Sequence, residues 1–430
     1  MSDLPRLVVS DSKGNIFVHP KLVMLAFDGK AMRLPREEEL IVLPRASKLF
    51  FMVGHISFGY SPVQGEAVAV ADYKGRLVYP LSAFLIPGFT RLLHPAARKI
   101  DLKTVLPLWA YAAVGFRQGR FITSAIKIDR RSRQRPSYYK DRALLGRKAR
   151  NMVKKHRKNR LIRHLFNCAL NYNCLAAQNF FFGRWEAPLP VAPSCNARCL
   201  GCLSLQASSC PVASHSRITF VPSPQEVEEV ALIHIRNAKE PIVSFGQGCE
   251  GEPLLEFKTL REAILGIRKN TDKGTIHLNT NAYSPEKIKQ LKEAGLDSIR
   301  ISLNSLKPAL YDAYFRPKGY GLKEVISSIK TAKKSGLFVA VNLLVFPGVT
   351  DTEEEVDHLS DFLNKGYVDM IQWRNLCIDS DYLLKNIPGQ NLNPLGVYGM
   401  IKRIREKNPR IIFGYFNLPK NMFKKGYSVI

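Results

Sequence analysis

The chain has 430 residues, of which 46% are hydrophobic and 23% charged, and its formal net charge is +28. This length allows two or three domains, and the hydrophobic content is that of a globular protein, which excludes a disordered or fibrous chain. The longest nearly uncharged apolar stretch, at 105–116, is about twelve residues, whereas a membrane span needs about 20. The N-terminus also lacks the basic start and apolar run of a signal peptide, so we expect a cytoplasmic protein with reduced thiols and no membrane contact.

Residues 1–126 are predicted to form a β-rich N-terminal domain. Short runs of Val, Ile, Phe and Tyr alternate there with turn signals such as SDSKGN at 10–15 and DYKGR at 72–76. Such spacing is typical of a small antiparallel sheet or barrel.

Residues 127–187 are predicted to be a basic helical connector. Apolar residues recur among Arg and Lys at helical spacing, and the segment 127–163 holds 16 basic and 2 acidic residues, half of the net charge. The charge is therefore local: residues 1–189 hold 33 basic and 12 acidic residues, whereas 190–430 hold 31 and 24. Two interpretations stay open, an RNA substrate bound along 127–163 and a solvated helix face.

Residues 188–381 alternate between apolar strands and amphipathic helices, the pattern of parallel β/α units. Six strands are too few for a closed eight-unit barrel, so the predicted fold is α/β, a partial (β/α)6 barrel like part of a TIM barrel, with its site at the carboxyl ends of the strands. The expected strands lie at 187–193, 241–248, 275–281, 298–305, 338–348 and 368–376. Residues 382–430 contain four prolines and are expected to be a C-terminal extension that covers the barrel.

Three cysteines directly follow the first expected barrel strand. Cys195, Cys199 and Cys202 have the spacing CxxxCxxC, and thiolates so placed on one loop can converge on an iron–sulfur cluster. Three ligands for a four-iron cluster leave one iron open to another molecule. Zinc is the alternative, with Cys210 or His215 as the fourth ligand.

With the segment VSFGQGCEGEPLL at 243–255, this triad resembles the radical S-adenosylmethionine (radical SAM) superfamily over residues 188–380. CNARCLGC and FGQGCEGEPLL together are also similar to a bacterial subgroup of it. The resemblance implies a 4Fe-4S cluster whose open iron chelates S-adenosylmethionine, an electron donor such as flavodoxin or ferredoxin, and cleavage of the cofactor to a 5'-deoxyadenosyl radical. Neither the final substrate nor the fate of the cofactor, consumed or regenerated, follows from it.

The resemblance also implies cofactor contacts. Glu252 and the main chain around Gly251 are expected to meet the methionine ammonium group. Further contacts are expected at the strand ends, at Asn281, Ser302, Asn304, Asn342 and Arg374. The sequence departs from the family pattern in having Gly201 where an aromatic residue usually precedes the third cysteine, Glu250 for the first Gly of GGEP, and Asn304 for an Asp. These departures affect the fine geometry of cofactor binding and leave the metal ligands in place.

The remaining cysteines allow weaker hypotheses. Cys377 follows the sixth expected strand, where its thiol could donate a hydrogen atom to a substrate radical or carry a methyl group; core packing is the alternative. Four further cysteines could converge on a second cluster, but they are scattered and free Cys is commonly buried, so one cluster is expected. These four are Cys168, Cys174, Cys210 and Cys249.

Three functions fit these patterns. The first is a radical SAM enzyme acting on RNA. The second is one that modifies or activates a peptide or protein, and the third is a non-catalytic iron–sulfur or RNA-binding protein.

Overall fold

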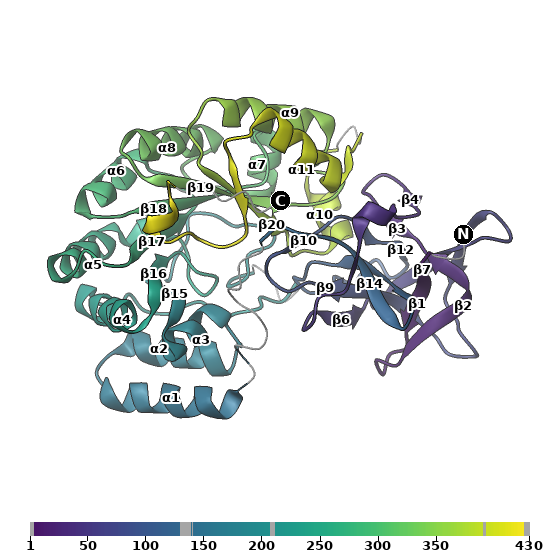
Figure 1. The fold of residues 1–430 in the computed structure, drawn as a ribbon, viewed down its shortest axis with the longest axis horizontal. Coiled ribbons are helices and arrows are strands. Elements are labelled where there is room, and N and C mark those ends of the chain that lie inside the picture. The colour runs from purple at the N-terminus through teal and green to yellow at the C-terminus, as the bar shows by residue number, and fades with distance from the viewer. Residues whose placement is uncertain (1–3, 130–138, 140, 207–210, 390–392, 425–430) are drawn as a thin grey trace.

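A computed structural model describes residues 4–129, 139, 141–206, 211–389 and 393–424. Figure 1 shows two parts, a β-rich part at the N-terminus and a larger α/β part formed by the rest of the chain. Within the described ranges, no helix combines the length and the apolar composition that a membrane crossing requires. Cys210 and most of residues 130–140 lie outside the described residues.

The N-terminal part consists of antiparallel strands. One eleven-stranded sheet contains most of them, and β11, β3 and β4 form a second, smaller sheet. Side chains alternate between buried and half-buried along β7, as expected for a strand with one face against a core. The strands are β1 (Arg6–Ser10), β2 (Ile16–Met24), β3 (Ala26–Phe27), β4 (Met32–Arg33), β5 (Leu40–Val42), β6 (Lys48–Phe51), β7 (His55–Ser61), β8 (Glu66–Val70), β9 (Tyr79–Phe84), β10 (Phe89–Arg91), β11 (His94–Pro95), β12 (Ala97–Lys99), β13 (Ala112–Arg117) and β14 (Arg120–Lys127).

Three helices follow: α1 (Arg142–Lys155), α2 (Arg160–Leu170) and α3 (Leu175–Phe182). The Asp141 carboxylate accepts a hydrogen bond from the backbone of Leu144 and so begins α1, and the Asn159 side chain begins α2 in the same way. Helix α2 buries an apolar face against the core, whereas the Lys and Arg side chains of α1 are exposed. The connector is thus a layer of helices packed beside the first barrel strand.

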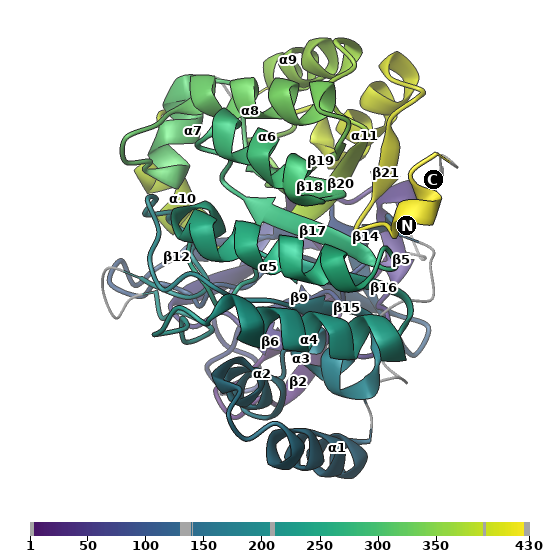
Figure 2. The same ribbon diagram turned by 90° about the vertical axis from the view of Figure 1, so that its left-hand side faces the viewer.

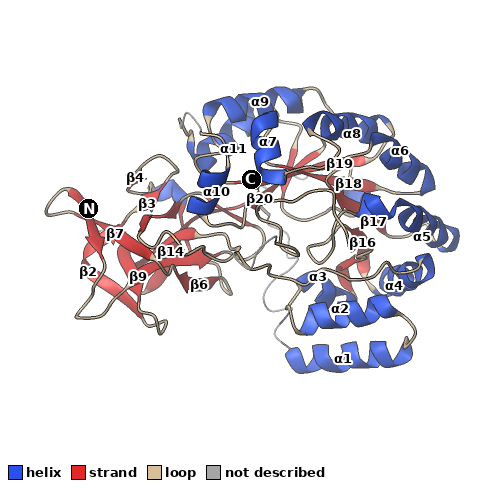
Figure 3. Cartoon of the chain, turned by 180° about the vertical axis from the view of Figure 1, so that it is seen from behind, coloured by secondary structure: helices blue, strands red, loops and turns tan. Residues whose placement is uncertain are grey.

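The α/β part is a curled parallel sheet with helices on its outer side, which confirms the predicted fold class (Figures 2 and 3). Its strands follow one another in chain order. They are β15 (Arg184–Pro188), β16 (Lys239–Phe245), β17 (Thr275–Thr280), β18 (Ser298–Leu303), β19 (Phe338–Val345), β20 (Met370–Asn375) and β21 (Ile412–Gly414). The helices are α4 (Pro224–Asn237), α5 (Phe257–Asn270), α6 (Pro285–Ala294), α7 (Pro308–Phe315), α8 (Leu322–Lys334), α9 (Glu353–Asn364), α10 (Ser380–Asn386) and α11 (Gly396–Lys407).

The sheet has one more strand than the sequence pattern indicates. Strand β21 comes from the C-terminal extension and pairs in parallel with β20, Met370 opposite Ile412. It has three residues, too few to produce a recognisable apolar run. The chain then passes the amino ends of the strands, where Lys420 N donates to Thr275 Oγ1 (2.8 Å) and Phe423 stacks on Phe338. The extension therefore covers the end of the barrel opposite the cysteine triad.

The N-terminal part contacts the barrel where β20 ends. Thr90 Oγ1 of β10 donates to the Trp373 carbonyl (2.8 Å), and Asn375 Nδ2 donates to the Phe89 carbonyl (2.9 Å). The backbone N–H of Arg91 completes the contact by donating to Asn375 Oδ1 (2.8 Å). The β-rich part thus closes one side of the barrel mouth.

Arg91 is fully buried in this contact. Its Nη2 donates to the Leu376 carbonyl (3.0 Å) and its Nη1 to the Tyr111 carbonyl (3.3 Å), and its guanidinium lies 5.1 Å from the Phe346 ring centre. Burial lowers the pKa of Arg91 to about 10.

Replacing Arg91 by alanine is expected to weaken the contact between the two parts. The change leaves two buried carbonyls without donors and opens a cavity, at a cost of about 3 kcal/mol. The midpoint of thermal unfolding should fall by roughly 3–4 °C for a chain of this length. Calorimetry measures it, with Arg120→Ala, at an exposed arginine of β14, as the matched control. An unchanged midpoint would show that Arg91 does not hold the parts together.

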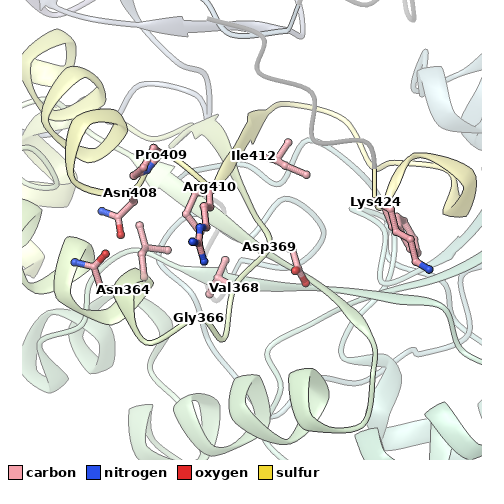
Figure 4. Close-up of a pocket in the computed structure, with 12 residues that line it drawn as sticks. Asn364, Gly366, Val368, Asp369, Asn408, Pro409, Arg410, Ile412 and Lys424 are labelled. Atoms are coloured by element: carbon pink, nitrogen blue, oxygen red, sulfur yellow. The ribbon is translucent and has the colours of Figure 1, made fainter.

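One surface hollow lies at the amino ends of β20 and β21 (Figure 4). It measures about 580 Å³, and its lining includes Asn364, Asp369, Arg410 and Lys424. Active sites of such barrels lie at the opposite, carboxyl end of the strands. We therefore place the candidate site elsewhere.

Candidate active site at the barrel mouth

The cysteine triad lies on the loop that follows β15, held against the end of α7 and the residues after it. Leu200 N donates to the Tyr314 carbonyl (3.0 Å), and Arg198 N donates to the Phe315 carbonyl (3.1 Å). Lys318 N donates in return to the Asn196 carbonyl (2.8 Å). The thiols are therefore positioned by main-chain hydrogen bonds to a segment more than a hundred residues away in sequence.

The thiols of the triad are in a poorly solvated environment. Burial raises the pKa of Cys195 to about 11 and that of Cys199 well above its ordinary value. Arg217 Nη2 donates to Cys202 Sγ (3.4 Å). Because metals bind thiolates, a metal entering this loop would release protons from Cys195 and Cys199.

Glu250 connects this loop to the turn after β16. Its carboxylate is buried and accepts four backbone N–H groups, from Val191 (2.8 Å), Ala192 (3.2 Å), Gly246 (2.6 Å) and Gln247 (2.9 Å). Burial raises its pKa to about 7, and the four N–H groups oppose that rise. The glutamate that departs from the family pattern thus holds the chain leading into the triad.

Glu250→Gln is expected to disturb this connection. An amide has one oxygen for the four donors, and its NH₂ group would face N–H groups that already need an acceptor. Leaving buried donors unsatisfied costs about 1–3 kcal/mol, so both thermal stability and iron uptake should fall. Iron per chain after reconstitution is the measurement, with Glu262→Gln on the exposed face of α5 as control. Equal iron uptake in both variants would exclude this role for Glu250.

Gly251 lies where the turn after β16 meets the triad loop. Its N–H donates to the Ala192 carbonyl (2.7 Å), and the N–H of Glu252 donates to the Ser194 carbonyl (2.9 Å). A Cβ added to Gly251 would lie 1.8 Å from the Ser194 oxygen. Only glycine permits this approach of the two main chains.

Glu252 is buried, and its carboxylate accepts three hydrogen bonds from within the chain. The donors are Leu254 N (3.0 Å), Thr280 Oγ1 (2.5 Å) and Asn281 N (2.8 Å). Burial raises its pKa to about 7. A carboxylate has about four acceptor positions, so one remains for a further donor.

The predicted residues on later strands have different neighbours, and Asn342 lies within β19 rather than at its carboxyl end. Asn281 Nδ2 donates to Asn196 Oδ1 on the triad loop (2.7 Å). Ser302 and Asn342 are opposite each other on β18 and β19, 3.4 Å apart from Oγ to Nδ2. Asn304 Nδ2 donates to the Leu310 carbonyl (3.1 Å) in α7. Among the described residues, the buried Oδ1 atoms of Asn304 and Asn342 have no hydrogen-bond partner.

Arg374 and Cys377 lie at the end of β20. Arg374 Nη1 donates to the Tyr415 carbonyl (2.9 Å), and the Arg374 guanidinium stacks on the Tyr415 ring. The C-terminal extension therefore already uses part of the hydrogen-bonding capacity of Arg374. The Cys377 thiol faces the carbonyl of Asn375 (3.6 Å), and burial raises its pKa. A Cβ on Gly201 would lie 3.4 Å from the Cys377 carbonyl oxygen, so this part of the chain adjoins the triad loop.

Tyr314 is a site residue that sequence reasoning missed. It is buried, and its hydroxyl would lie 2.9 Å from a Cβ on Gly201. Tyr314 therefore occupies the space beside the third cysteine that an aromatic side chain at position 201 would fill. The sequence gives no signal for this, because the ring comes from α7.

The inside of the sheet holds a second set of missed residues, which are polar and charged. Glu186 Oε1 accepts from Ser244 Oγ (2.5 Å) and from Asn417 Nδ2 (2.8 Å). Arg300 Nη1 donates to Gln372 Oε1 (2.8 Å), and burial lowers the pKa of Arg300 to about 9. These residues make the barrel interior polar below the triad, where a hydrocarbon core would be expected.

Residues 189–362 match the sequence profile of the radical SAM superfamily. These residues therefore form a radical SAM domain. The match covers the triad and strands β16 to β19, whereas β15, β20 and β21 lie outside it.

Curated relatives are similar to part of the chain. The GTP 3',8-cyclase of Listeria welshimeri is 30% identical over 181 residues, which are 41% of this chain and 48% of that protein. The GTP 3',8-cyclase of Aquifex aeolicus is 33% identical over 171 residues, 38% of this chain and 49% of that protein. The chain thus spans about half the length of these relatives.

Among solved structures, the chain is similar to the FeFe-hydrogenase maturase HydG from Carboxydothermus hydrogenoformans. The identity is 15% and the TM-score 0.39, over 63% of this chain and 69% of that one.

The residues at the mouth fit the two cofactors that radical SAM domains use, a 4Fe-4S cluster and S-adenosylmethionine. Three thiols share one loop and leave the fourth cluster position to another molecule. The unpartnered oxygens of Asn304 and Asn342 and the remaining acceptor position of Glu252 suit hydroxyl and ammonium donors. The donor set therefore agrees with the cofactors.

Proposed function

We propose that this protein is a radical SAM enzyme whose active site is the barrel mouth. The observation that carries the proposal is the cysteine triad held against the Gly251–Glu252 main chain at the carboxyl ends of the strands. A cluster bound by Cys195, Cys199 and Cys202 would supply one electron to S-adenosylmethionine and yield a 5'-deoxyadenosyl radical that removes a hydrogen atom from the substrate.

The chain's own residues would bind and orient the cofactor and would keep water out of the mouth. Glu252 would accept a hydrogen bond from the methionine ammonium group at its remaining position, and Asn304 and Asn342 would accept from the cofactor's hydroxyl or amino groups. Asn281 and Ser302 would keep these groups in register through their bonds to the triad loop and to Asn342. The β-rich part and Arg91 would close one side of the mouth against water.

Anaerobic reconstitution tests this proposal. Protein loaded with iron and sulfide should convert S-adenosylmethionine to 5'-deoxyadenosine and methionine in the presence of a strong reductant, as measured by liquid chromatography. Protein that holds four irons per chain but forms neither product would be the non-catalytic iron–sulfur alternative. A flavodoxin or ferredoxin should replace the chemical reductant; this donor and the cytoplasmic location remain predictions.

Cys377 and Arg374 are proposed to act on the substrate side of the mouth. Cys377→Ser should still release 5'-deoxyadenosine, because the thiol is not a cluster ligand, but it should not complete turnover of the substrate. Full turnover by this variant would show that the thiol is not catalytic. The buried Arg91, the half-buried Arg300 and Arg374 together favour a substrate that carries negative charge.

RNA is the substrate class that the basic segment 127–163 suggests, although the comparisons do not support an RNA partner. The supporting observation is a hollow of about 690 Å³ beside α1, lined by Lys148, Lys155, Phe182 and Arg236. Cations with an aromatic ring suit a phosphate backbone with a stacked base. Retention of tRNA should fall steeply with salt; no retention near physiological ionic strength would exclude RNA and leave a peptide or a small anion.

A further inference from the structure

A second group of metal-binding side chains lies on the other side of the loop after β16. His164 and Cys168 are four residues apart on α2 and therefore share a face, and Cys249 belongs to the turn between β16 and Glu250. The Nε2 and two Sγ atoms all lie within 4.8 Å of one another, with 3.4 Å between His164 Nε2 and Cys168 Sγ. Cys168 and Cys249 are fully buried.

These distances suit one metal ion better than a cluster. Around a tetrahedral zinc with bonds of about 2.0–2.3 Å, neighbouring ligand atoms lie about 3.3–3.8 Å apart. The His164 to Cys168 separation has this length before any metal is bound. Thiolates of a four-iron cluster each bind a different iron, so their sulfurs must lie farther apart than the ligands of a single ion.

Cys174 adjoins this group and is the candidate for its fourth ligand. Its backbone N–H donates to the Cys168 carbonyl (3.0 Å), which turns the chain back on itself between α2 and α3. Cys174 precedes the first residue of α3, and its thiol meets the backbone N–H groups of Ala176 and Ala177 there, bonds that a metal-bound thiolate also accepts. With it the group becomes Cys₃His, a donor set typical of structural zinc sites.

We propose that His164, Cys168, Cys174 and Cys249 bind one Zn²⁺ ion that joins the connector helices to the cofactor loop. Cys249 is adjacent to Glu250, whose carboxylate holds the chain leading into the triad. The ion would therefore fix α2 and α3 to the same turn that positions the cluster ligands. A structural site with four protein ligands needs no open position, in contrast to the triad.

Element analysis of reconstituted full-length protein tests the proposal. We expect about one zinc per chain beside the four irons. The double variant Cys168→Ser/Cys249→Ser should lose the zinc, and irons retained by it would show that the chain still folds. Zinc that is absent from the parent protein, or unchanged in the double variant, would overturn the proposal, as would eight irons per chain or a Cys168–Cys249 disulfide in anaerobically purified protein.

Cobalt gives a second measurement that does not depend on the double variant. The triple variant Cys195→Ala/Cys199→Ala/Cys202→Ala removes the cluster ligands and leaves the proposed zinc ligands. Added Co²⁺ should produce the ligand-field and thiolate charge-transfer bands of a tetrahedral site with sulfur ligands. An octahedral spectrum without thiolate bands would contradict the site. Neither measurement requires cleavage of S-adenosylmethionine, so the outcome is separate from that of the proposed function.

Discussion

Replacing Cys199 by alanine is expected to abolish both the cluster and the formation of 5'-deoxyadenosine. The triad has three protein ligands, so removing one leaves two thiols and two irons without protein ligands. The loss should be complete rather than graded. No neighbouring thiol is positioned to substitute within the described part of the triad loop, which ends at residue 206 before the gap at 207–210.

Absorbance of the reconstituted protein and product formation together measure the effect. The broad charge-transfer absorbance of the cluster should disappear, and 5'-deoxyadenosine should fall to the level of a reaction without protein. Cys377→Ala is the matched control, because it removes a thiol at the same mouth without removing an expected ligand. A Cys199→Ala variant that retains four irons would assign the cluster to other residues.

The strands of the half-barrel could be predicted because each is a short apolar run bounded by turn signals. Parallel strands buried on both faces favour such runs, and β19, with the sequence FVAVNLLV, is an example. The expected and observed starts of β17, β18 and β19 coincide. Strand β21 was not predicted from the sequence, because it is short and its stability comes from pairing with β20 rather than from its own composition.

The triad could be predicted because its residues lie on one loop, within eight positions. The residues that position it could not, because they come from distant segments. Tyr314 reaches the third cysteine from α7, and Glu250 bonds to residues almost sixty positions earlier. In the sequence, Glu250 is only a departure from a glycine pattern, and its role depends on four N–H groups that converge in the fold.

The proposed zinc ligands could not be predicted from the sequence for the same reason, because they come from distant segments. The spacing of His164 and Cys168 is visible in the sequence, but Cys249 follows 81 positions after Cys168. In the sequence Cys168, Cys174, Cys210 and Cys249 are scattered, so no second cluster was expected from them. Only the packing of α2 against the turn after β16 brings His164 and Cys168 within ligand distance of Cys249.

Gly251→Ala is expected to reduce cleavage of S-adenosylmethionine about 100-fold, because a displacement of about 1 Å in a positioning segment has that effect. The new Cβ would lie 1.8 Å from the Ser194 oxygen and 3.1 Å from the Cys195 nitrogen, so the two main chains must separate. Backbone atoms cannot turn aside as the end of a flexible side chain can. The first cluster ligand and the proposed ammonium site would therefore move apart.

Gly248→Ala is the matched control for this variant. It changes a glycine of the same turn, but its Cβ would meet only Leu203 Cδ1 at 3.8 Å, an ordinary contact. Initial rates of 5'-deoxyadenosine formation should stay near the parent value in Gly248→Ala and fall in Gly251→Ala, at equal iron content. If both variants cleave the cofactor at the parent rate, the close approach of the two main chains is not needed to position the cofactor. If Gly251→Ala instead loses its iron, the approach positions the cluster ligands themselves, because the displaced segment leads directly into Cys195.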